Sequence, residues 1–379
     1  MNPAVWLSLT ALVVALVAVV LVLVERRARA ALAVGTSDPR TVTASLESPQ
    51  VPRPLVAFVA NPSKPGVPEL RDKAVQACSS RYLPEPLWFE TTEEDPGVGQ
   101  AREAVKAGAS VVVAVGGDGT VRAVAEGLAG TKASMGLLPQ GTGNLLARNL
   151  DLPLNDVDAL LRIALNGTDK PIDVGWLTVV RAATPPPDGD PDGIKKPAPE
   201  TEPDRDHIFL VIGGLGFDAA MVADTDENLK AKVGWIAYFV AGVRHMHSRR
   251  MRLEVSLDQG TWHRLVLRSL LIGNCGRLPG GITLLPDAVL DDGWLDVGAI
   301  DTRGGLVGWT QLFGEVAMQR FGVRTELPNK VGRIDHARAR EVRVRTREPH
   351  QVQVDGDVIG TALELSARVD HRALTVRVP

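Results

Sequence analysis

Cysteine is scarce in this 379-residue sequence, which contains only Cys78 and Cys275, far apart along the chain. This scarcity excludes a disulfide scaffold and a cysteine-rich zinc site, and it suits a reducing compartment. Aromatic residues make up only 4% of the chain, so there is little material for stacking nucleic-acid bases. Basic residues are not in excess either, because the formal net charge is −3. The sequence therefore predicts no nucleic-acid partner.

What is present is the composition of a globular protein. Hydrophobic residues account for 45% of the chain and charged residues for 23%, which excludes a disordered, collagen-like or polytopic membrane protein. A length of 379 residues suits two domains with additional segments.

The N-terminal region contains a long apolar run, from Ala4 to Val24, without a charged residue. As a helix it would span about 31 Å, which matches a hydrocarbon core of roughly 30 Å. A cleaved signal peptide and a buried core helix are the alternatives, but no Lys or Arg precedes the run. Arginines follow it, so the positive-inside rule puts the rest of the chain in the cytoplasm. We therefore predict a single-pass cell-membrane protein with a transmembrane anchor over residues 1–28.

Two segments have the composition of connections rather than of packed structure. Residues 29–54 are rich in Ala, Ser, Thr and Pro without a clear period, and they predict a linker. Residues 181–206 are rich in proline and acids and lie between two strand-like runs. They predict a long disordered loop inside a domain.

Between residues 55 and 170, short apolar runs alternate with amphipathic ones. Continuous apolar strands alternating with helices predict an α/β domain whose parallel sheet is covered on both faces. After Pro171 the pattern changes to strands separated by Gly and Pro turns, and the run from Lys232 is the main helical exception. Residues 171–379 therefore predict an all-β sandwich domain, and a return of its last strand to the first domain stays open.

The strongest local pattern is an apolar strand that runs directly into Gly116-Gly117-Asp118-Gly119-Thr120, followed at once by a helix. Glycines let a backbone approach a ligand closely, and a helix N-terminus offers free N–H groups to phosphate. An acid in such a loop requires a nearby divalent cation or a role in proton transfer. The alternative is a structural turn in which Asp118 only caps the helix. The glycine spacing is neither that of a Walker A loop nor that of a dinucleotide fingerprint.

Two similar loops follow other strands of the same predicted sheet. One is Gln140-Gly141-Thr142-Gly143-Asn144, and the other is Asn61-Pro62-Ser63-Lys64-Pro65-Gly66. Loops at the carboxyl ends of adjacent parallel strands converge on one ligand. Together the three loops predict a nucleotide site.

Acidic residues gather in two places in the predicted β domain. Asp287, Asp291, Asp292 and Asp296 lie within ten residues, and this density of like charge needs a cation or water. A solvated acidic hairpin is the alternative. Farther along, Asp355 and Asp357 flank Gly356, where the glycine leaves the relative direction of the two side chains open.

These motifs resemble those of the bacterial lipid kinases of the diacylglycerol kinase catalytic-domain family, which are related to sphingoid-base kinases. The resemblance runs from Leu55 to the C-terminus, with the proline-rich loop as an insertion. GGDGT alone also occurs in NAD kinases and phosphofructokinases, whereas its combination with PDAVLDDGWLDV and VDGD is highly specific. The resemblance implies an α/β nucleotide-binding domain of the phosphofructokinase and NAD kinase type, followed by a β-sandwich domain that binds lipid.

The resemblance also implies site residues. The ATP-binding positions are Asn61, Pro62, Ser63, Gly66, Thr92, Gly116, Gly117, Asp118, Gly119, Thr120, Thr142 and Asn144. A structural Mg²⁺ is implied on Asp292 with the carbonyl groups of Val289 and Trp294. The catalytic acids are Asp118, Asp355 and Asp357, with Asp355 as the expected base and Asp357 as its alternative. The sequence departs from the family pattern at Arg122, where Asn is common, and at Asp357, where Glu is common.

The predicted function is an ATP-dependent and Mg²⁺-dependent kinase that phosphorylates a membrane lipid hydroxyl, with diacylglycerol as the leading acceptor and phosphatidic acid as the product. The alternatives are a sphingoid-base or other lipid kinase and a non-catalytic lipid-binding protein of the same fold. The membrane surface is an expected partner, and a homodimer stays open. The predicted anchor would hold the catalytic domains on the cytoplasmic side of the cell membrane.

Overall fold

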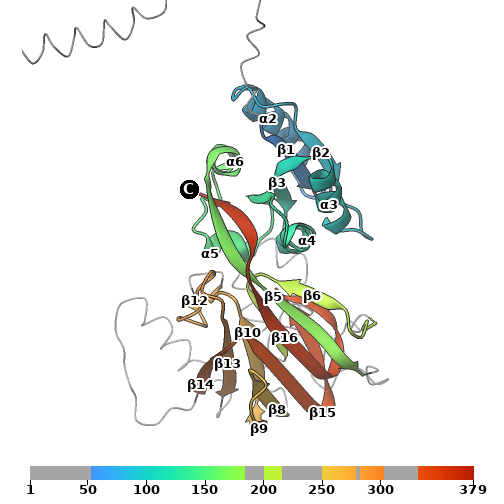
Figure 1. The fold of residues 1–379 in the computed structure, drawn as a ribbon, viewed down its shortest axis with the longest axis vertical. Coiled ribbons are helices and arrows are strands. Elements are labelled where there is room, and N and C mark those ends of the chain that lie inside the picture. Colours follow the sequence, from blue (N-terminus) through green and yellow to red (C-terminus); the bar gives the residue numbers. More distant parts are fainter. Residues whose placement is uncertain (1–52, 184–199, 216–249, 279–281, 303–331) are drawn as a thin grey trace, which may run out of the picture. The chain divides into compact units, whose positions relative to one another are not determined.

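The computed structural model describes residues 53–183, 200–215, 250–278, 282–302 and 332–379 (Figure 1). The predicted anchor and nearly all of the predicted linker lie outside the described residues, as does the helical run from Lys232. Most of the predicted loop over residues 181–206 lies outside them as well.

Helices in the described part of the chain are short. The longest, α2, has 13 residues and is therefore about 20 Å long, well below a hydrocarbon thickness of about 30 Å. None of the described helices is long and apolar enough to cross a membrane. This finding overturns the prediction of a single-pass membrane protein with cytoplasmic catalytic domains. The run Ala4–Val24, which suggested it, lies outside the described residues.

The first half of the described chain folds into a parallel sheet with helices. Its strands pair in the order β4-β3-β1-β2, and every pairing among them is parallel. Helix α3 packs against α4, and α2 packs against α6. Right-handed crossovers put these two helix pairs on opposite faces of the sheet. The elements are β1 Leu55–Ala60, α2 Val67–Ser79, β2 Leu87–Glu90, α3 Val98–Lys106, β3 Ala109–Gly116, α4 Asp118–Leu128, β4 Ser134–Pro139, α5 Leu145–Asn149 and α6 Val157–Asn166.

The second half is built from antiparallel strands around a core of its own. In β15, Val342 and Val344 are buried, whereas Arg343 and Arg345 between and after them are exposed. This alternation is typical of a strand with one face on a core. The strands are β5 Thr168–Ala182, β6 Asp206–Phe209, β7 Ile212–Leu215, β8 Met251–Leu257, β9 His263–Leu267, β10 Ser269–Gly273, β11 Arg277–Leu278, β12 Ile282–Thr283, β13 Leu295–Thr302, β14 Gly332–Ala339, β15 Glu341–Val354 and β16 Asp357–Val378.

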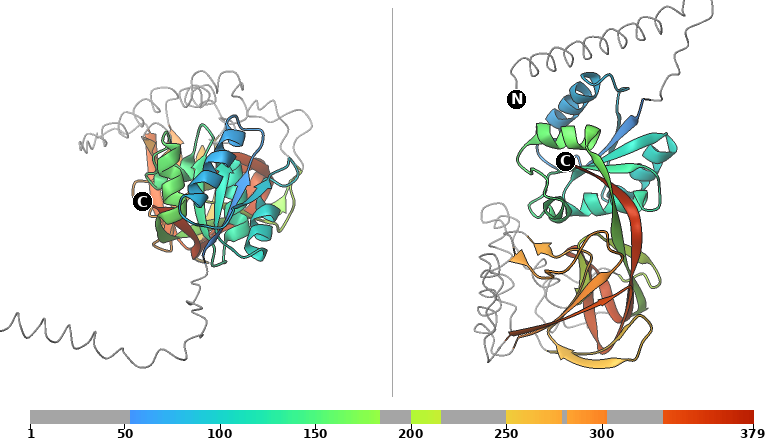
Figure 2. Two further views of the ribbon diagram at one scale, coloured as in Figure 1. Left: turned by 90° about the horizontal axis from the view of Figure 1, so that it is seen from above. Right: turned by 60° about the vertical axis from the view of Figure 1, so that its left-hand side comes forward.

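Two long strands, β5 and β16, connect the halves. They pair antiparallel with each other, and near its end β16 pairs in parallel with β4, with Thr375 opposite Ser134. Figure 2 shows the red end of β16 reaching the α/β half beside the green strand β5. One hydrogen-bonded sheet therefore runs through both halves, and the predicted boundary at residue 170 falls inside β5.

Two helices differ from the sequence-based expectation. Helix α4 begins at Asp118, because Gly117 is extended and acts as the N-cap, so Asp118, Gly119 and Thr120 form its first turn instead of a loop. Helix α6 is not part of the predicted alternation. Its N-cap is Asp156, whose carboxylate accepts the N–H of Ala159 at 2.8 Å.

Candidate functional site

The predicted nucleotide-binding residues gather at one edge of the parallel sheet. They follow β1, β2, β3 and β4, which are adjacent and parallel, so the carboxyl ends of these strands share an edge. Backbone bonds join neighbouring loops there. The N–H of Asn61 donates to the carbonyl of Val115 at 2.9 Å, and the N–H of Gln140 donates to the carbonyl of Gly116 at 2.7 Å.

The loop after β1 is a compact turn. The Asn61 side-chain oxygen accepts the N–H of Ser63 at 3.0 Å and its hydroxyl at 2.7 Å. Pro62 and Ser63 are exposed, and Gly66, at φ 82°, leads into α2. This left-handed conformation favours glycine. The loop therefore presents its polar groups to solvent on a fixed backbone.

Thr92 holds the turn that follows β2. Its hydroxyl accepts the N–H of Asp95 at 3.1 Å, and its own N–H donates to the Asp95 carbonyl at 3.0 Å. The Asp95 carboxylate in turn accepts the N–H groups of Gly97 and Gly99 at the start of α3. Thr92 thus fixes the start of α3 beside the other loops. The pKa of Glu94 is lowered by its own backbone N–H and by a hydrogen bond from the Thr92 side chain.

The two glycine loops touch through their backbones. A Cβ atom on Gly141 would lie 2.9 Å from the Cα of Gly117, closer than side chains tolerate. Beside this contact, the Asn144 side chain accepts the N–H of Gly141 at 3.0 Å and donates to its carbonyl at 2.7 Å. Thr142 between them is exposed. Glycine at position 141 lets the loops after β3 and β4 meet.

Asp118 joins the same two loops from its place in α4. Its carboxylate accepts the N–H of Asn144 at 2.8 Å and that of Leu145 at 2.6 Å. Burial raises the pKa of Asp118, the two N–H groups oppose this rise, and the negative charge of Asp357 adds to it. Asp118 therefore does cap a helix, as the structural alternative expected. The helix is α5, however, and not α4, to which Asp118 belongs.

Asp357 reaches this edge from the β half. Its carboxylate accepts Arg122 Nη2 at 2.6 Å and lies 3.7 Å from where a Cβ on Gly119 would be. The Asp357 side chain is 55% exposed, whereas that of Arg122 is 18% exposed. An acid on the hairpin between β15 and β16 therefore lies against the first turn of α4.

Asp355, two residues earlier, has a different setting. Its carboxylate accepts three backbone N–H groups at the corner between β6 and β7, from Leu210 at 2.8 Å, Val211 at 2.8 Å and Ile212 at 3.0 Å. Burial raises the pKa of Asp355 to about 6, against the opposing effects of these N–H groups and of Arg122. The left-handed Asp355 (φ 48°) and Gly356 (φ 90°) turn the chain, so the two acids point to different surroundings.

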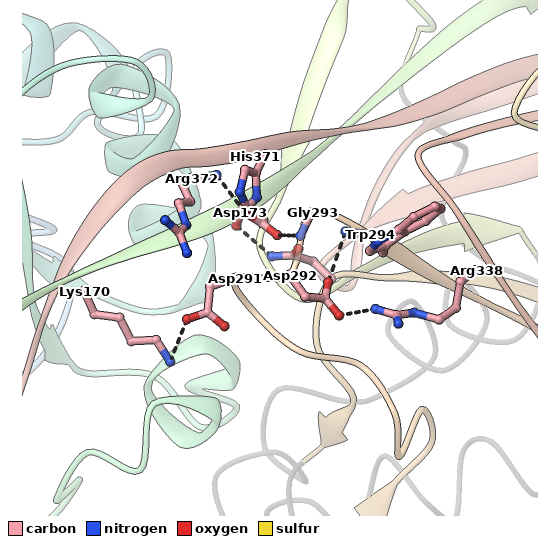
Figure 3. A network of polar contacts seen from close by, with 10 residues as sticks. Lys170, Asp173, Asp291, Asp292, Gly293, Trp294, Arg338, His371 and Arg372 are labelled. Atoms are coloured by element: carbon pink, nitrogen blue, oxygen red, sulfur yellow. Dashed lines mark hydrogen bonds and ion pairs between the residues drawn. The ribbon is translucent and has the colours of Figure 1, made fainter.

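The acid-rich loop before β13 makes its polar contacts elsewhere (Figure 3). Asp292 accepts the N–H of Trp294 at 3.1 Å and forms an ion pair with Arg338 of β14. The same guanidinium lies 3.7 Å from the carboxylate of Asp296 and 5.8 Å from the centroid of the Trp294 ring. Burial raises the pKa of Asp296, and the charge of Arg338 opposes the rise.

A buried carboxylate fastens this loop to the long strands. Asp173 of β5 is fully buried, and it accepts the N–H of Gly293 at 2.6 Å and that of Arg372 at 2.7 Å. The Nδ1 atom of His371 lies 2.7 Å from it as well. Figure 3 shows these groups converging on Asp173 from β16 and from the acid-rich loop.

The residues at Asp292 do not fit a resident Mg²⁺. Mg²⁺ demands oxygen ligands in near-ideal octahedral geometry. Here the Asp292 carboxylate already has the guanidinium of Arg338 on one oxygen and the N–H of Trp294 on the other. Val289, whose carbonyl is implied as a ligand, is 46% exposed. Lys170, 3.6 Å from Asp291, provides a second cation for the loop.

The structure thus brings the predicted nucleotide residues, Asp118 and Asp357 to one edge, and it leaves Asp292 and Trp294 in another network. Val289 is an exposed residue of the same loop. Sequence reasoning missed the functions of Asp173 and Arg338, and it noted Arg122 only as a departure from the family pattern. Asp173 is an acid inside a strand that is otherwise largely apolar, a pattern that signals a buried polar contact. No local pattern marks the partners of Arg122 or Arg338.

Comparisons with known proteins agree with this arrangement. Residues 58–177 match the model of the diacylglycerol kinase catalytic domain, and residues 212–378 match that of the YegS C-terminal NAD kinase beta sandwich-like domain. A Pseudomonas aeruginosa protein named "Probable lipid kinase YegS-like" is 31% identical over 336 residues, which cover 86% of this chain and 94% of that protein. The chain belongs to the YegS-like lipid kinases of the diacylglycerol kinase catalytic-domain family.

Two further matches cover less of the chain or support only its fold. A Pseudomonas putida protein of the same name is 35% identical over 209 residues, which cover 54% of this chain and 61% of that protein, less than two thirds of its length. The crystal structure of a diacylglycerol kinase from Bacillus anthracis superimposes with a TM-score of 0.61 at 21% identity, covering 86% of this chain and 97% of that one. The α/β domain followed by a β-sandwich domain is therefore the family fold, and the predicted family and kinase class are confirmed.

Proposed function

We propose that this lipid kinase transfers the γ-phosphoryl group of ATP to a hydroxyl group of diacylglycerol and so produces phosphatidic acid. The observation that carries the proposal is the ion pair of Asp357 with Arg122 of α4, which puts the Asp357 carboxylate beside Gly119. It joins an acid of the β-sandwich domain to the glycine loop of the α/β domain. A kinase needs this juxtaposition, because the acceptor hydroxyl must lose a proton while it attacks the phosphoryl group.

On the nucleotide side, the N-terminus of α4 supports the binding of phosphate. No side chain caps this helix end, so its first N–H groups and its dipole can face a phosphate group. The contact between Gly117 and Gly141 lets the loop after β4 lie against the same helix end. The proposed nucleotide residues after β1 and β2, including Ser63 and Thr92, extend this surface along the sheet edge. Mg²⁺ enters with ATP as part of the substrate.

On the acceptor side, we assign the base to Asp357 and a positioning role to Asp355. A base needs a free lone pair within reach of the hydroxyl proton. The Asp357 side chain is more than half exposed beside the glycine loop after β3. Both carboxylate oxygens of Asp355, in contrast, accept hydrogen bonds from three N–H groups at the corner between β6 and β7. The hydroxyl oxygen bonds to the γ-phosphorus, the bond to the ADP oxygen breaks, and the proton goes to Asp357.

The choice of a membrane lipid rests on the family, whose members are named as lipid kinases, and the choice of diacylglycerol rests on the matching catalytic-domain model. Diacylglycerol resides in bilayers, so the protein has to meet a membrane surface during turnover. This encounter is part of the proposal.

The experiment is a phosphoryl-transfer assay with the purified full chain, γ-labelled Mg-ATP and mixed micelles that carry diacylglycerol, a sphingoid base or no added lipid. The proposal predicts labelled phosphatidic acid and little label on the sphingoid base. Label on the sphingoid base alone would show that the acceptor is a sphingoid base and not diacylglycerol. If ATP binds in calorimetry but no lipid is labelled, the protein is a binding protein rather than a kinase.

A further inference from the structure

We propose that Arg122 is a positioning residue that holds Asp357 at the phosphate loop. The proposal rests on the proposed function, because it deepens the acceptor side of that site. Arg122 is the fifth residue of α4 and therefore lies one turn after Asp118 on the same face of the helix. Side chains tilt toward the N-terminus of a helix, so Arg122 extends back toward the glycine loop.

The contacts of Arg122 span the hairpin that carries the acids. Its Nη2 atom donates to Asp357 at 2.6 Å, and its Nη1 atom donates to the carbonyl of Val354 at 3.4 Å. Val354 ends β15 and Asp357 begins β16, so one planar guanidinium contacts both sides of the turn. A planar fork of this kind fixes two acceptors in a set geometry, which a lysine ammonium does not do.

Arg122 is better fixed than the acid that it contacts. Its side chain is 18% exposed, whereas that of Asp357 is 55% exposed. An exposed short carboxylate on a turn has several rotamers available, and an ion pair with a partly buried guanidinium selects one of them. The selected position lies against Gly119, where an acceptor hydroxyl would have to approach a bound phosphate.

The charge of Arg122 also reaches the other groups at this corner. Burial raises the pKa of Asp355, and the charge of Arg122 opposes this rise. Burial lowers the pKa of His207 on β6, and the charges of Arg205 and Arg122 lower it further. One cation therefore faces both acids of the hairpin from the α/β side. We infer that Arg122 acts on turnover through Asp357 and makes no essential contact with ATP.

Steady-state kinetics of Arg122→Gln and Arg122→Lys test this inference with Mg-ATP and diacylglycerol micelles. Displacing a catalytic group by a fraction of its reach costs turnover, so Arg122→Gln is expected to lower kcat about ten-fold, with the KM for ATP changed less than about two-fold. Arg122→Lys should recover part of kcat, because a single ammonium can still pair with Asp357. Arg264→Gln is the matched control. It breaks the ion pair of Arg264 on β9 with Glu254 on β8, and it should keep wild-type kinetics.

The double variant identifies the route. If Arg122 acts through Asp357, the double variant Arg122→Gln/Asp357→Asn should have a kcat within about two-fold of that of Asp357→Asn alone. A full ten-fold further loss, or a loss that appears mainly in the KM for ATP, would show that Arg122 contacts the nucleotide and would overturn the inference. Unchanged kcat in Arg122→Gln would overturn it as well.

A crystallographic comparison does not depend on activity and separates this inference from the proposed function. In crystals of Arg122→Gln, the Asp357 carboxylate should leave its place against Gly119, whereas in wild-type crystals it should stay there. An Asp357 side chain in the same position in both crystals would refute the positioning role even if the wild-type protein phosphorylates no lipid.

Discussion

The glycine loops of the α/β domain and the acid-rich loop of the β-sandwich domain both carry aspartates, but they balance the charge differently. In the glycine loops, the carboxylate of Asp118 accepts backbone N–H groups of Asn144 and Leu145. In the acid-rich loop, Asp291 and Asp292 face the side-chain cations Lys170 and Arg338. The first carboxylate fixes a backbone, whereas the others are neutralised by flexible side chains.

The difference teaches which acids fix the backbone around them. Bonds from a buried carboxylate to backbone N–H groups hold the loop geometry that a phosphate group needs, and each such bond contributes about 1.5–3 kcal/mol. Ion pairs between partly exposed side chains contribute about 0–1 kcal/mol and leave the backbone free of direct contacts. The family resemblance and the acid density made the loop from Asp287 to Asp296 a metal candidate, and in the structure Arg338 balances part of its charge.

The largest effect is expected from a change at the contact between the two glycine loops. In Gly141→Val, a Cβ atom would lie 2.9 Å from the Gly117 backbone and 3.0 Å from the Asn144 side chain, so the loops must separate. We expect at least about a hundred-fold loss of kcat/KM, because misplacement of about 1 Å at a reacting site costs that much. Calorimetry should also show weaker ATP binding. ATP affinity equal to that of the wild type would mean that the loop after β4 takes no part in the site.

The second prediction concerns Asp355, which also binds backbone N–H groups but lies in the β half. Asp355→Asn leaves a single oxygen for three N–H donors, so unfolding should require about 1–3 kcal/mol less. Because the pKa of Asp355 in the folded protein is about 6, above its unfolded value, the folded state binds the proton more tightly. Its contribution to stability is therefore largest below about pH 4, falls as the pH rises to about 6 and is constant above.

Urea unfolding of the wild type and Asp355→Asn at pH 5 and pH 7 measures this effect. The stability difference between the two proteins should be larger at pH 5 than at pH 7, while titration of other acids such as Asp118 cancels in the difference. A difference that grows toward pH 7 would mean that the Asp355 carboxylate is stabilised in its charged form.

The smallest expected effect belongs to the acid-rich loop. Because Arg338 already neutralises Asp292, melting of the wild type should not respond to Mg²⁺ or to a chelator. Arg338→Gln should lower the melting temperature by about 1–2 °C, as expected for a loss of about 1 kcal/mol in a chain of this size. Adding Mg²⁺ should then restore part of that loss. A wild-type protein that melts earlier in chelator would reinstate a resident metal at this loop.

Much of the site could be predicted because its position follows from strand ends. Apolar runs that end in polar or glycine-rich segments predicted that residues 61–66, 116–120 and 140–144 share one edge, and the parallel sheet has this arrangement. Helix α6 could also have been predicted, since Asp156 is a preferred N-cap residue and Gly167 follows the last helical residue.

The remaining features depend on contacts between distant residues. Arg122 and Asp357 are 235 positions apart, and Asp292 and Arg338 are 46 positions apart, so no local pattern pairs them. The surroundings of Asp355 depend on the left-handed turn at Asp355 and Gly356, which separates two acids that a continuous strand would have kept on one face. Charge spacing along the chain cannot reveal which acid such a turn buries.

The comparison of Asp357→Asn with Asp355→Asn in the lipid phosphorylation assay tests the central claim most directly. Both changes keep the size of the side chain and remove its ability to take a proton at neutral pH. A base in proton transfer contributes about 10²–10⁴-fold, so Asp357→Asn should lower kcat at least about a hundred-fold with ATP affinity unchanged. Asp355→Asn should keep turnover within about ten-fold of the wild type once folded. An inactive Asp355 variant beside an active Asp357 variant, both folded, would contradict the account and return the base to Asp355.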